Sequence, residues 1–475
     1  MTPNTSLGNM PGNTPEDMRN DAPEERPPGD AAPATPDTLR PGARPRGHVL
    51  AVGFGVTTAV WLIGYVSLMQ PGLLVGEALF ALMLLAMLAG GVVIGRYAGG
   101  GWQAGAAAGA LAGLLNIMIV GGLIGDTSRP LEVALWLGGN FLVPAALGAI
   151  GAAVGRRFAR PLPADFNWYG VFTKLAAATV FLLLVSGGIV TGWEAGLAVP
   201  DWPQSFGHNM ILYPLAEMIT PEAIEEGVHY EHAHRLYGML VGMMAIMLLV
   251  TLPFYDKRRW PAVIAAAILV MVIIQGILGG TRVTKESLVL ALGHGVFGQV
   301  IFAAVACVAA VTSTTWHRAA GALTEAAPAD RKLSVILLGL LLVQLLLGAS
   351  FRHLKFDESA AEGMVTGLLH SHLLFAFVVA AMAVIVGIRA RALHHGQPVL
   401  PLLGVSLLVL IVLQLGLGFA AWVVVLAQET GRVAQWVQVI VTTSHQATGA
   451  VILATASLIA VWVWRLLRPT ATPDR

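Results

Sequence analysis

The chain has 475 residues, of which 56% are hydrophobic and only 12% are charged, and its formal net charge is +1. Soluble domains carry roughly 25% charged residues, so this composition excludes a soluble globular enzyme, a disordered protein and a nucleic-acid-binding protein. It is typical of a polytopic membrane protein. The single cysteine, Cys307, excludes a disulfide framework and a thiolate metal cluster within one chain.

The first segment, 1–47, is rich in Pro, Asp, Glu, Arg and Thr and poor in large apolar residues. Such a segment cannot bury enough surface to fold, so we expect a disordered cytoplasmic tail. Apolar runs long enough to cross a bilayer follow from His48 onward. Twelve spans are predicted, near residues 49–69, 73–95, 103–125, 131–155, 168–192, 233–254, 261–281, 288–314, 333–352, 365–388, 399–427 and 438–466.

Lysine and arginine residues lie in alternate loops, which predicts the orientation of the spans. They precede span one and follow spans four, six, eight, ten and twelve, whereas the opposite loops contain few of them. The longest opposite loop, 193–232, contains acidic residues and no lysine or arginine. We therefore expect a multi-pass protein of the inner (plasma) membrane with both termini in the cytoplasm.

The last eight spans contain an internal repeat. YEHAHRLYG (230–238) resembles LLHSHLLFA (368–376), and QGILGG (275–280) resembles QLGLGF (414–419). GHGVFGQVIFA also resembles SHQATGAVILA, at 293–303 and 444–454. Each unit begins on the same side of the membrane, which indicates a parallel duplication of a four-helix bundle.

The predicted fold is therefore an all-α polytopic membrane protein with two pseudo-symmetric four-helix bundles, preceded by about four extra transmembrane helices. We divide the chain into a tail at 1–47, an extra transmembrane module without an assigned role at 48–160, a first bundle at 161–320 and a second bundle at 321–475.

Four histidines occupy repeat-equivalent positions near the starts of their spans: His234, His294, His372 and His445. All four spans start from the non-cytoplasmic side, so the imidazoles are expected at similar depth toward the outer face. Ionisable groups inside a membrane are usually functional. Two inward-facing imidazoles per bundle suit a haem iron with one axial ligand on each side.

Two other readings of these histidines stay open. Each could be a hydrogen-bonded packing residue, although four repeat-equivalent positions disfavour this. A zinc ion would need three or four ligands around one centre, which a pair per bundle does not supply. His232 and His370 lie two residues before a predicted ligand and are expected to form interfacial hydrogen bonds instead.

The two bundles differ beside the histidines. Glu231 lies three residues before His234 and Arg235 follows it, whereas the second bundle has Leu369 and Leu373 at those positions. An i, i+3 spacing places Glu231 on the same face as His234. Glu231 could move protons beside the iron, or it could be an ordinary acid at a helix start. Arg235 could pair with a haem propionate or with a carboxylate.

These motifs together resemble haem A synthase over residues 168–467. The resemblance rests on the four histidines, on GGIVTGWEAGLAVPDWPQSFG (187–207), on EHAHRLYG (231–238), on QGILGGTRV (275–283) and on LGASFRH (347–353). It implies an eight-helix enzyme that oxidises a methyl group of haem O to the formyl group of haem A for cytochrome oxidase biogenesis, with oxygen derived from water.

The resemblance also implies residue roles. His234 and His294 would be the axial ligands of the substrate haem O, and His372 and His445 those of haem b. Glu231 would be the catalytic carboxylate. From its position beside His234, and not from the resemblance, Arg235 is also assigned to haem binding. Some members have a cysteine pair in the first outer loop, which this chain lacks, and 208–230 reads as an insertion.

The expected partners follow from this reading. They are membrane lipid, haem O and an electron acceptor, with haem O synthase, other assembly factors of cytochrome oxidase and a second copy of the chain as further candidates. No nucleic acid is expected. The alternatives are a dihaem b-type electron carrier and, less favoured, a parallel-repeat transporter in which the histidines relay protons.

Overall fold

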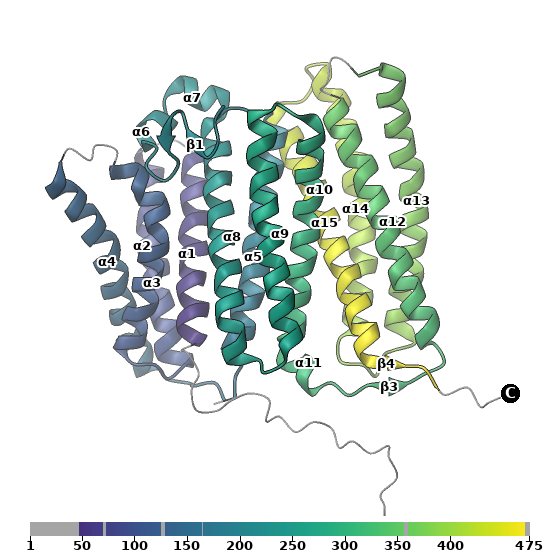
Figure 1. The fold of residues 1–475 in the computed structure, drawn as a ribbon, viewed down its shortest axis with the longest axis horizontal. Helices are drawn as coiled ribbons and strands as arrows, with labels where there is room; N and C mark the ends of the chain where they lie inside the picture. Colours follow the sequence, from purple (N-terminus) through teal and green to yellow (C-terminus); the bar gives the residue numbers. More distant parts are fainter. Residues whose placement is uncertain (1–46, 70–72, 125–128, 164, 356–359, 471–475) are drawn as a thin grey trace, which may run out of the picture. The chain divides into compact units, whose positions relative to one another are not determined.

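The structure is a computed structural model that describes residues 47–69, 73–124, 129–163, 165–355 and 360–470 (Figure 1). Nearly all of the predicted tail, 1–47, lies outside these residues. Within them, twelve helices are long and apolar enough to cross a membrane, which confirms the predicted number of spans. The only strands in this part of the chain are four two-residue segments, so the predicted all-α class is confirmed.

The long helices run nearly end to end across the structure. They are α1 (Gly47–Met69), α2 (Leu73–Tyr97), α3 (Trp102–Ile124), α4 (Pro130–Arg157), α5 (Trp168–Gly192), α8 (Val228–Tyr255), α9 (Arg259–Thr284), α10 (Leu288–Val311), α12 (Ala327–Leu354), α13 (Glu362–Ala392), α14 (Leu400–Glu429) and α15 (Gln435–Leu466). The short elements are β1 (Gln204–Ser205), β2 (His208–Asn209), α6 (Leu215–Met218), α7 (Pro221–Glu226), α11 (Thr314–Arg318), β3 (Ala322–Leu323) and β4 (Leu467–Arg468).

Local chemistry explains where several helices begin. The side chains of Asn167 and Ser287 accept hydrogen bonds from backbone N–H groups in the first turns of α5 and α10. Gly227 ends α7 with a φ of +77° and leads directly into α8. As a result α8 begins at Val228, five residues before the predicted start of that span at 233. His229 therefore lies in the first turn of α8 and is buried.

The last eight long helices form two groups of four. In the first group α5, α8, α9 and α10 each contact the next, and α10 contacts α5. In the second group α12, α13, α14 and α15 are arranged in the same way, with α15 against α12. The boundaries of the four predicted segments of the chain remain predictions.

Glycines allow α2, α3 and α4 to approach one another closely. A Cβ atom at Gly109 of α3 would lie 1.9 Å from the carbonyl oxygen of Pro144 in α4. A Cβ atom at Gly95 of α2 would lie 2.1 Å from the carbonyl oxygen of Ala152. Small residues of this kind are the usual means by which transmembrane helices bring their backbones together.

Helix α1 joins this module to the first bundle. The ring of Phe54 lies 5.2 Å from that of Phe172 on α5, and the ring of Trp61 lies 5.6 Å from that of Tyr237 on α8, measured between centroids. Both Phe54 and Trp61 are almost completely buried. The core of the first bundle is therefore continuous with the extra module.

The two bundles meet along α15. A Cβ atom at Gly188 of α5 would lie 2.9 Å from Thr443 Cγ2, and one at Gly192 would lie 3.0 Å from Val439 Cγ1. Helix α15 also contacts α10. Strands β3 and β4 pair in parallel, so the segment between the bundles is hydrogen-bonded to the end of the last helix.

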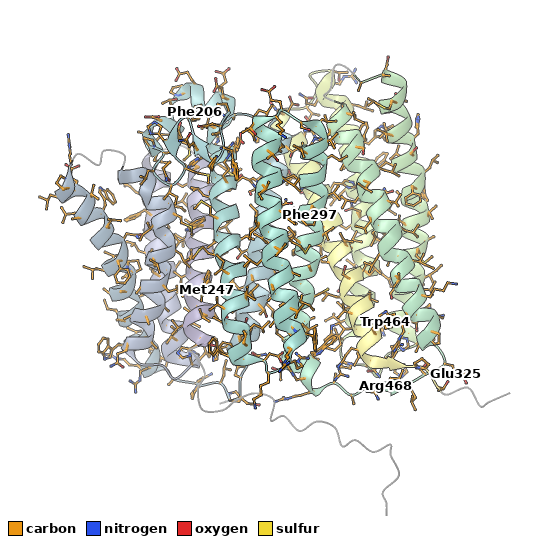
Figure 2. The ribbon with its side chains drawn as sticks, viewed as in Figure 1. Phe206, Met247, Phe297, Glu325, Trp464 and Arg468 are labelled. Atoms are coloured by element: carbon orange, nitrogen blue, oxygen red, sulfur yellow. The ribbon has the colours of Figure 1, made fainter. Side chains whose placement is uncertain are left out.

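The two ends of the helices differ. The segment 193–227, which contains β1, β2, α6 and α7, lies at one end, called here the cap end (Figure 1). The other, basic end carries α11, β3 and β4. Figure 2 shows Phe206 at the cap end and Glu325, Arg468 and Trp464 toward the basic end.

Candidate functional site

The four predicted histidine ligands form two pairs. His234 on α8 lies opposite His294 on α10, with 6.4 Å between ring centroids and 78° between ring planes. His372 on α13 lies opposite His445 on α15, with values of 6.3 Å and 81°. The sequence repeat is thus matched by two nearly identical imidazole pairs.

This spacing fits one iron between each pair of rings. A transition metal lies about 2.0–2.1 Å from an imidazole nitrogen, and that nitrogen lies about 1.1 Å from its ring centroid, which together give centroids about 6.3 Å apart. Bis-histidine haem ligation requires this arrangement. Among the described residues no group of three or more His, Cys, Asp and Glu side chains could hold a metal ion. The geometry therefore fits haem better than zinc.

Each histidine ring lies against a glycine on a neighbouring helix. A Cβ atom on that glycine would come within 2.7–3.0 Å of the ring carbon Cε1. The four glycine–histidine pairs are Gly187 with His234, Gly279 with His294, Gly348 with His372, and Gly418 with His445. Real Cβ contacts are rarely this short, so these positions need glycine for the rings to keep their places.

A glutamine one turn before the glycine accompanies three of the four histidines. Gln275 Nε2 donates to the backbone carbonyl of His294 at 2.9 Å, and Gln344 Nε2 donates to that of His372 at 3.0 Å. Gln414 Nε2 lies 3.5 Å from His445 Nε2. Leu183 stands at the corresponding position of the first helix, α5. In α9 and α12 the pattern Gln-x-x-x-Gly therefore joins the helix to the backbone of the histidine-bearing helix beside it.

The hydrogen bonds also orient the rings. His294 Nδ1 lies 3.1 Å from the carbonyl oxygen of Gln275, which can only accept, so Nε2 remains available to a metal. Ser186 Oγ lies 2.9 Å from Nδ1 of His234. His372 Nδ1 lies 3.3 Å from the carbonyl of Gln344. Three of the four rings thus have Nδ1 partnered inside the protein.

Glu231 and Arg235 form a buried ion pair beneath the cap segment. Arg235 Nη2 donates to Glu231 Oε1 at 2.7 Å, and the side chains of both residues are more than nine-tenths buried. The backbone N–H of Val199 donates to Glu231 Oε2 at 2.9 Å. Both carboxylate oxygens therefore have donors, and Glu231 is not an exposed acid at a helix start.

Arg235 also fixes the cap segment to α8. Its guanidinium donates to the backbone carbonyls of Val199 at 2.7 Å, Asp201 at 2.7 Å and Gln204 at 3.2 Å. Of the two roles predicted for Arg235, the structure places it against a carboxylate. Its contact with haem remains a proposal.

Further contacts order the cap. The carboxylate of Asp201 accepts the backbone N–H groups of Phe206 and Gly207, both at 2.7 Å. His232 is buried, and its Nδ1 lies 3.3 Å from Ser205 Oγ. Burial, assisted by the nearby Glu217, raises the pKa of Tyr213, so this phenol is neutral at physiological pH. The 208–230 insertion is therefore part of a folded cover over the first bundle.

Two arginines to which the sequence analysis assigned no role lie at the same end. Arg282 on α9 donates to the carbonyl of Gly196 at 2.6 Å. Arg352 on α12 donates to the carbonyl of Thr191 at 2.7 Å. Because α12 belongs to the second bundle and Thr191 to the first, Arg352 joins the two bundles near the cap.

The chain is similar in sequence to known proteins. The COX15-CtaA family, described as cytochrome oxidase assembly protein, matches residues 106–306 and 170–367, together more than half of the chain. Curated haem A synthases from Listeria monocytogenes serotype 4a (strain HCC23) and Listeria innocua (strain CLIP 11262) are 29% identical to it over 126 residues. That alignment covers 26% of this chain and 37% of each relative.

No solved structure matches the chain. The alignment with the curated relatives covers little more than a third of their length. The family match begins within α3, in the module that the sequence motifs left outside the resemblance. It covers most of the first bundle, including Glu231, His234 and His294, and ends at the start of α13. The chain belongs to the COX15-CtaA family of cytochrome oxidase assembly proteins.

Proposed function

We propose that this protein is a haem A synthase, which oxidises a methyl group of haem O to the formyl group of haem A. The observation that carries the proposal is the combination of two equivalent histidine pairs with one buried carboxylate beside only the first. With water as the oxygen source, R–CH₃ and H₂O give R–CHO, four protons and four electrons. The reaction therefore needs an electron acceptor and a route for protons.

The first bundle is assigned to haem O and the second to haem b. His234 and His294 would hold the substrate, and His372 and His445 would hold the resident haem. Only the first pair has an ionisable side chain one turn away, since the equivalent of Glu231 is Leu369. A group needed to bind iron would occur in both bundles, whereas a group needed for reaction is required in one.

When bound, the haem supplies the redox chemistry, and the protein positions it and handles protons. Glu231 lies one turn from His234 on α8 and is the proposed proton acceptor beside this histidine. Arg235 Nη2 donates a hydrogen bond to Glu231 Oε1 at 2.7 Å. This oxygen can therefore take up a proton only when Arg235 moves away from it. Arg235 would thereby couple proton uptake to a movement of the cap segment, which it also holds.

The charge distribution supports an orientation for this site. The basic end would face the cytoplasm with both termini, and the cap end would face the outside of the inner membrane. Haem O and an electron acceptor would be the reaction partners. Haem O synthase, other oxidase assembly factors and a second copy of the chain are candidate protein partners.

Identification of the bound pigments tests this function against a dihaem electron carrier. The full-length protein is purified from a host that makes haem O, and its haems are extracted and identified by mass. A synthase should yield haem b together with haem O or haem A. Haem b as the only pigment would support the electron carrier, and absence of any porphyrin would support a transporter.

Substitution of Glu231 tests the mechanism. Glu231→Gln should retain haem but slow the conversion of haem O to haem A by about 10²–10⁴-fold, the usual contribution of a general acid or base. The ratio of haem A to haem O should fall accordingly. Glu222→Gln is the matched control, because Glu222 lies exposed in the same cap. Near-normal haem A with Glu231→Gln would leave the carboxylate with the structural role of holding Val199 and Arg235.

A further inference from the structure

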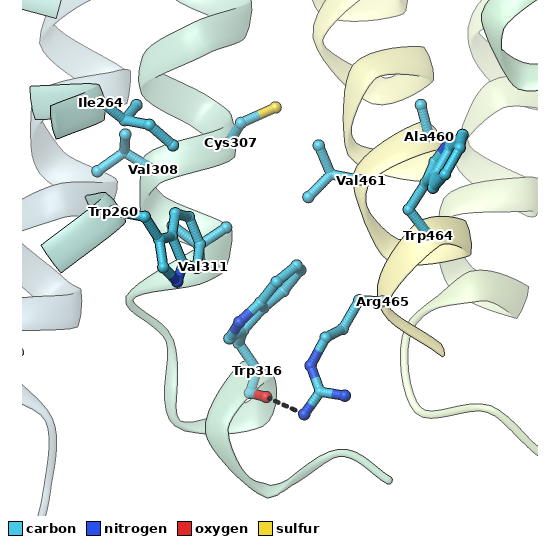
Figure 3. Close-up of a pocket in the computed structure, with 10 residues that line it drawn as sticks. All are labelled: Trp260, Ile264, Cys307, Val308, Val311, Trp316, Ala460, Val461, Trp464 and Arg465. Carbon is cyan, nitrogen blue, oxygen red and sulfur yellow. Dashed lines mark hydrogen bonds between the residues drawn. The ribbon is translucent and has the colours of Figure 1, made fainter. Parts of the chain in front are cut away.

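An apolar pocket lies at the basic end, far from the histidine pairs. It has a volume of about 470 Å³ and is lined from the first bundle by Trp260, Cys307 and Trp316 and from the second by Val461, Trp464 and Arg465 (Figure 3). Small-molecule pockets measure about 300–1,000 Å³. Arg465 is the only charged side chain among the lining residues. A cavity with so few polar partners does not hold ordered water well.

The pocket lies between the two bundles. Trp260 belongs to α9, Cys307 to α10 and Trp316 to α11, whereas Val461 and Arg465 belong to α15. Figure 3 shows the Cys307 sulfur pointing toward the α15 side of the pocket. Whatever fills this space contacts both bundles at once.

Positive charge at the rim lacks a matching carboxylate. Arg465 donates to the backbone carbonyls of Ala319 at 2.8 Å and Trp316 at 3.4 Å, and it forms no ion pair with a described acidic residue. The guanidinium of Arg331 lies 4.6 Å from the ring centroid of Trp464 and likewise has no acidic partner in the described part of the chain.

Two buried acids at this end are already engaged, whereas a third, Glu325, is exposed to solvent. Asp256 forms a close ion pair with Arg258. Asp330 accepts from Arg389 at 2.6 Å and lies 2.7 Å from His394 Nε2. Burial, followed by the charge of Arg258, lowers the pKa of His317, so this imidazole adds no positive charge at neutral pH. The unmatched positive charge at the pocket is thus that of Arg331, Arg465 and the nearby Arg468, which forms no ion pair with a described acid and whose charge acts on Arg465.

We propose that this pocket binds an anionic phospholipid, with an acyl chain among the tryptophans and the phosphate at Arg465. Apolar lining suits the chain, and unmatched arginines beside tryptophans at one membrane end suit an anionic headgroup. A neutral quinone would fill the same space but would gain nothing from the excess charge. A zwitterionic lipid would gain less than an anionic one, because its ammonium group offsets the charge of its phosphate. The lipid would pack between the two bundles and contact both of them.

Cys307 provides the test, because it is the single cysteine of the chain and lines the pocket. Full-length protein is treated with N-ethylmaleimide in micelles that contain either phosphatidylglycerol or phosphatidylcholine with the same acyl chains. Phosphatidylglycerol should slow alkylation about fivefold more than phosphatidylcholine, which corresponds to the roughly 1 kcal/mol of one arginine near a membrane surface. Arg465→Gln should remove the difference.

The matched control is Arg318→Gln. Arg318 lies at the same end but is exposed and paired with Asp165, so its loss should leave the fivefold difference unchanged. Val461→Trp, which fills the pocket, should lower the amount of phosphatidylglycerol that native mass spectrometry finds on the protein. This second measurement does not depend on the reactivity of Cys307.

Several results would overturn the proposal. Equal protection by the two phospholipids would show a pocket for any acyl chain. Equal protection by inorganic phosphate alone would show an anion site without a lipid, and stronger protection by a ubiquinone would show a quinone site. Unchanged phosphatidylglycerol on both Arg465→Gln and Val461→Trp would place the bound lipid elsewhere.

Discussion

The first and second bundles hold their histidines in the same way but cover them differently. Both pairs have centroid spacings of 6.3–6.4 Å and a glycine behind each ring. Over the first bundle, the cap buries His232, whereas its repeat equivalent His370 is exposed. The first bundle also packs against α1, while α14 of the second has few fully buried residues. The two histidine pairs thus share one geometry and differ in their surroundings.

Removal of one ligand from each pair gives the largest expected contrast between the bundles. His372→Ala should abolish the haem b spectrum and leave substrate haem in the first bundle, whereas His234→Ala should do the opposite. Reduced-minus-oxidised spectra and haem extraction measure both. If His234→Ala lost its haem b while His372→Ala kept it, the assignment of the two bundles would be reversed.

Loss of Arg235 should open the cap of the first bundle without affecting the second. Arg235→Gln leaves Glu231 as an unpaired buried charge, which typically costs about 3–5 kcal/mol. Proteolytic cleavage within 200–227 should become at least about a hundredfold faster, and the haem b spectrum should not change. Arg129→Gln, in an exposed pair with Glu132, is the control. A cap that resists protease equally well in Arg235→Gln would show that other contacts hold it.

The glycines behind the rings offer a finer comparison, because each bundle contains its own controls. Gly279→Ala and Gly348→Ala should each weaken haem retention in their own bundle by about 5–150-fold, since overpacking costs about 1–3 kcal/mol. Gly276→Ala and Gly339→Ala lie on the same two helices with no atom within 4 Å of the new Cβ, and should have little effect. Haem dissociation rates measure the difference. If the variant next to the histidine and its control on the same helix had equal effects, the close contact would be contradicted.

The smallest effect is expected at the glutamine of the second bundle. Gln344→Leu removes the hydrogen bond to the backbone carbonyl of His372, which is worth about 1 kcal/mol and should weaken haem b retention about fivefold. Gln435→Leu, at the exposed start of α15, is the control. Leu183 stands at the corresponding position of the first bundle and cannot donate such a hydrogen bond, so the first bundle has no equivalent contact to lose. An unaltered dissociation rate would show that the helix pairing does not need the amide.

The sequence predicted the twelve spans and the histidine pairs because hydropathy and a repeat are properties of the chain itself. It missed the complete Gln-x-x-x-Gly pattern, since two copies were recognised in QGILGG and QLGLGF while 344–348 was not compared and the first helix has Leu183 instead. The start of α8 was placed too late because His229, Glu231 and His232 are polar. They are buried only because the cap folds over them.

The partner of Glu231 was equally beyond a reading of local pattern. Arg235 follows it by one turn, but the contacts that decide its role come from Val199, Asp201 and Gln204, which lie 31–36 residues away in the chain. Such long-range contacts depend on how the cap segment packs. Local pattern therefore allows two roles for Arg235, and in the fold its guanidinium contacts the carboxylate of Glu231.

The position of α15 has a consequence for the order in which the protein is made. This last helix packs against α5 through Gly188 and Gly192, and it carries His445 on another face. While the ribosome is still producing α14, the second site lacks one of its two imidazoles and the wall of the first bundle faces lipid. The second pair of histidines is therefore complete only after translation has passed His445, and α5 gains its contact with α15 at the same step.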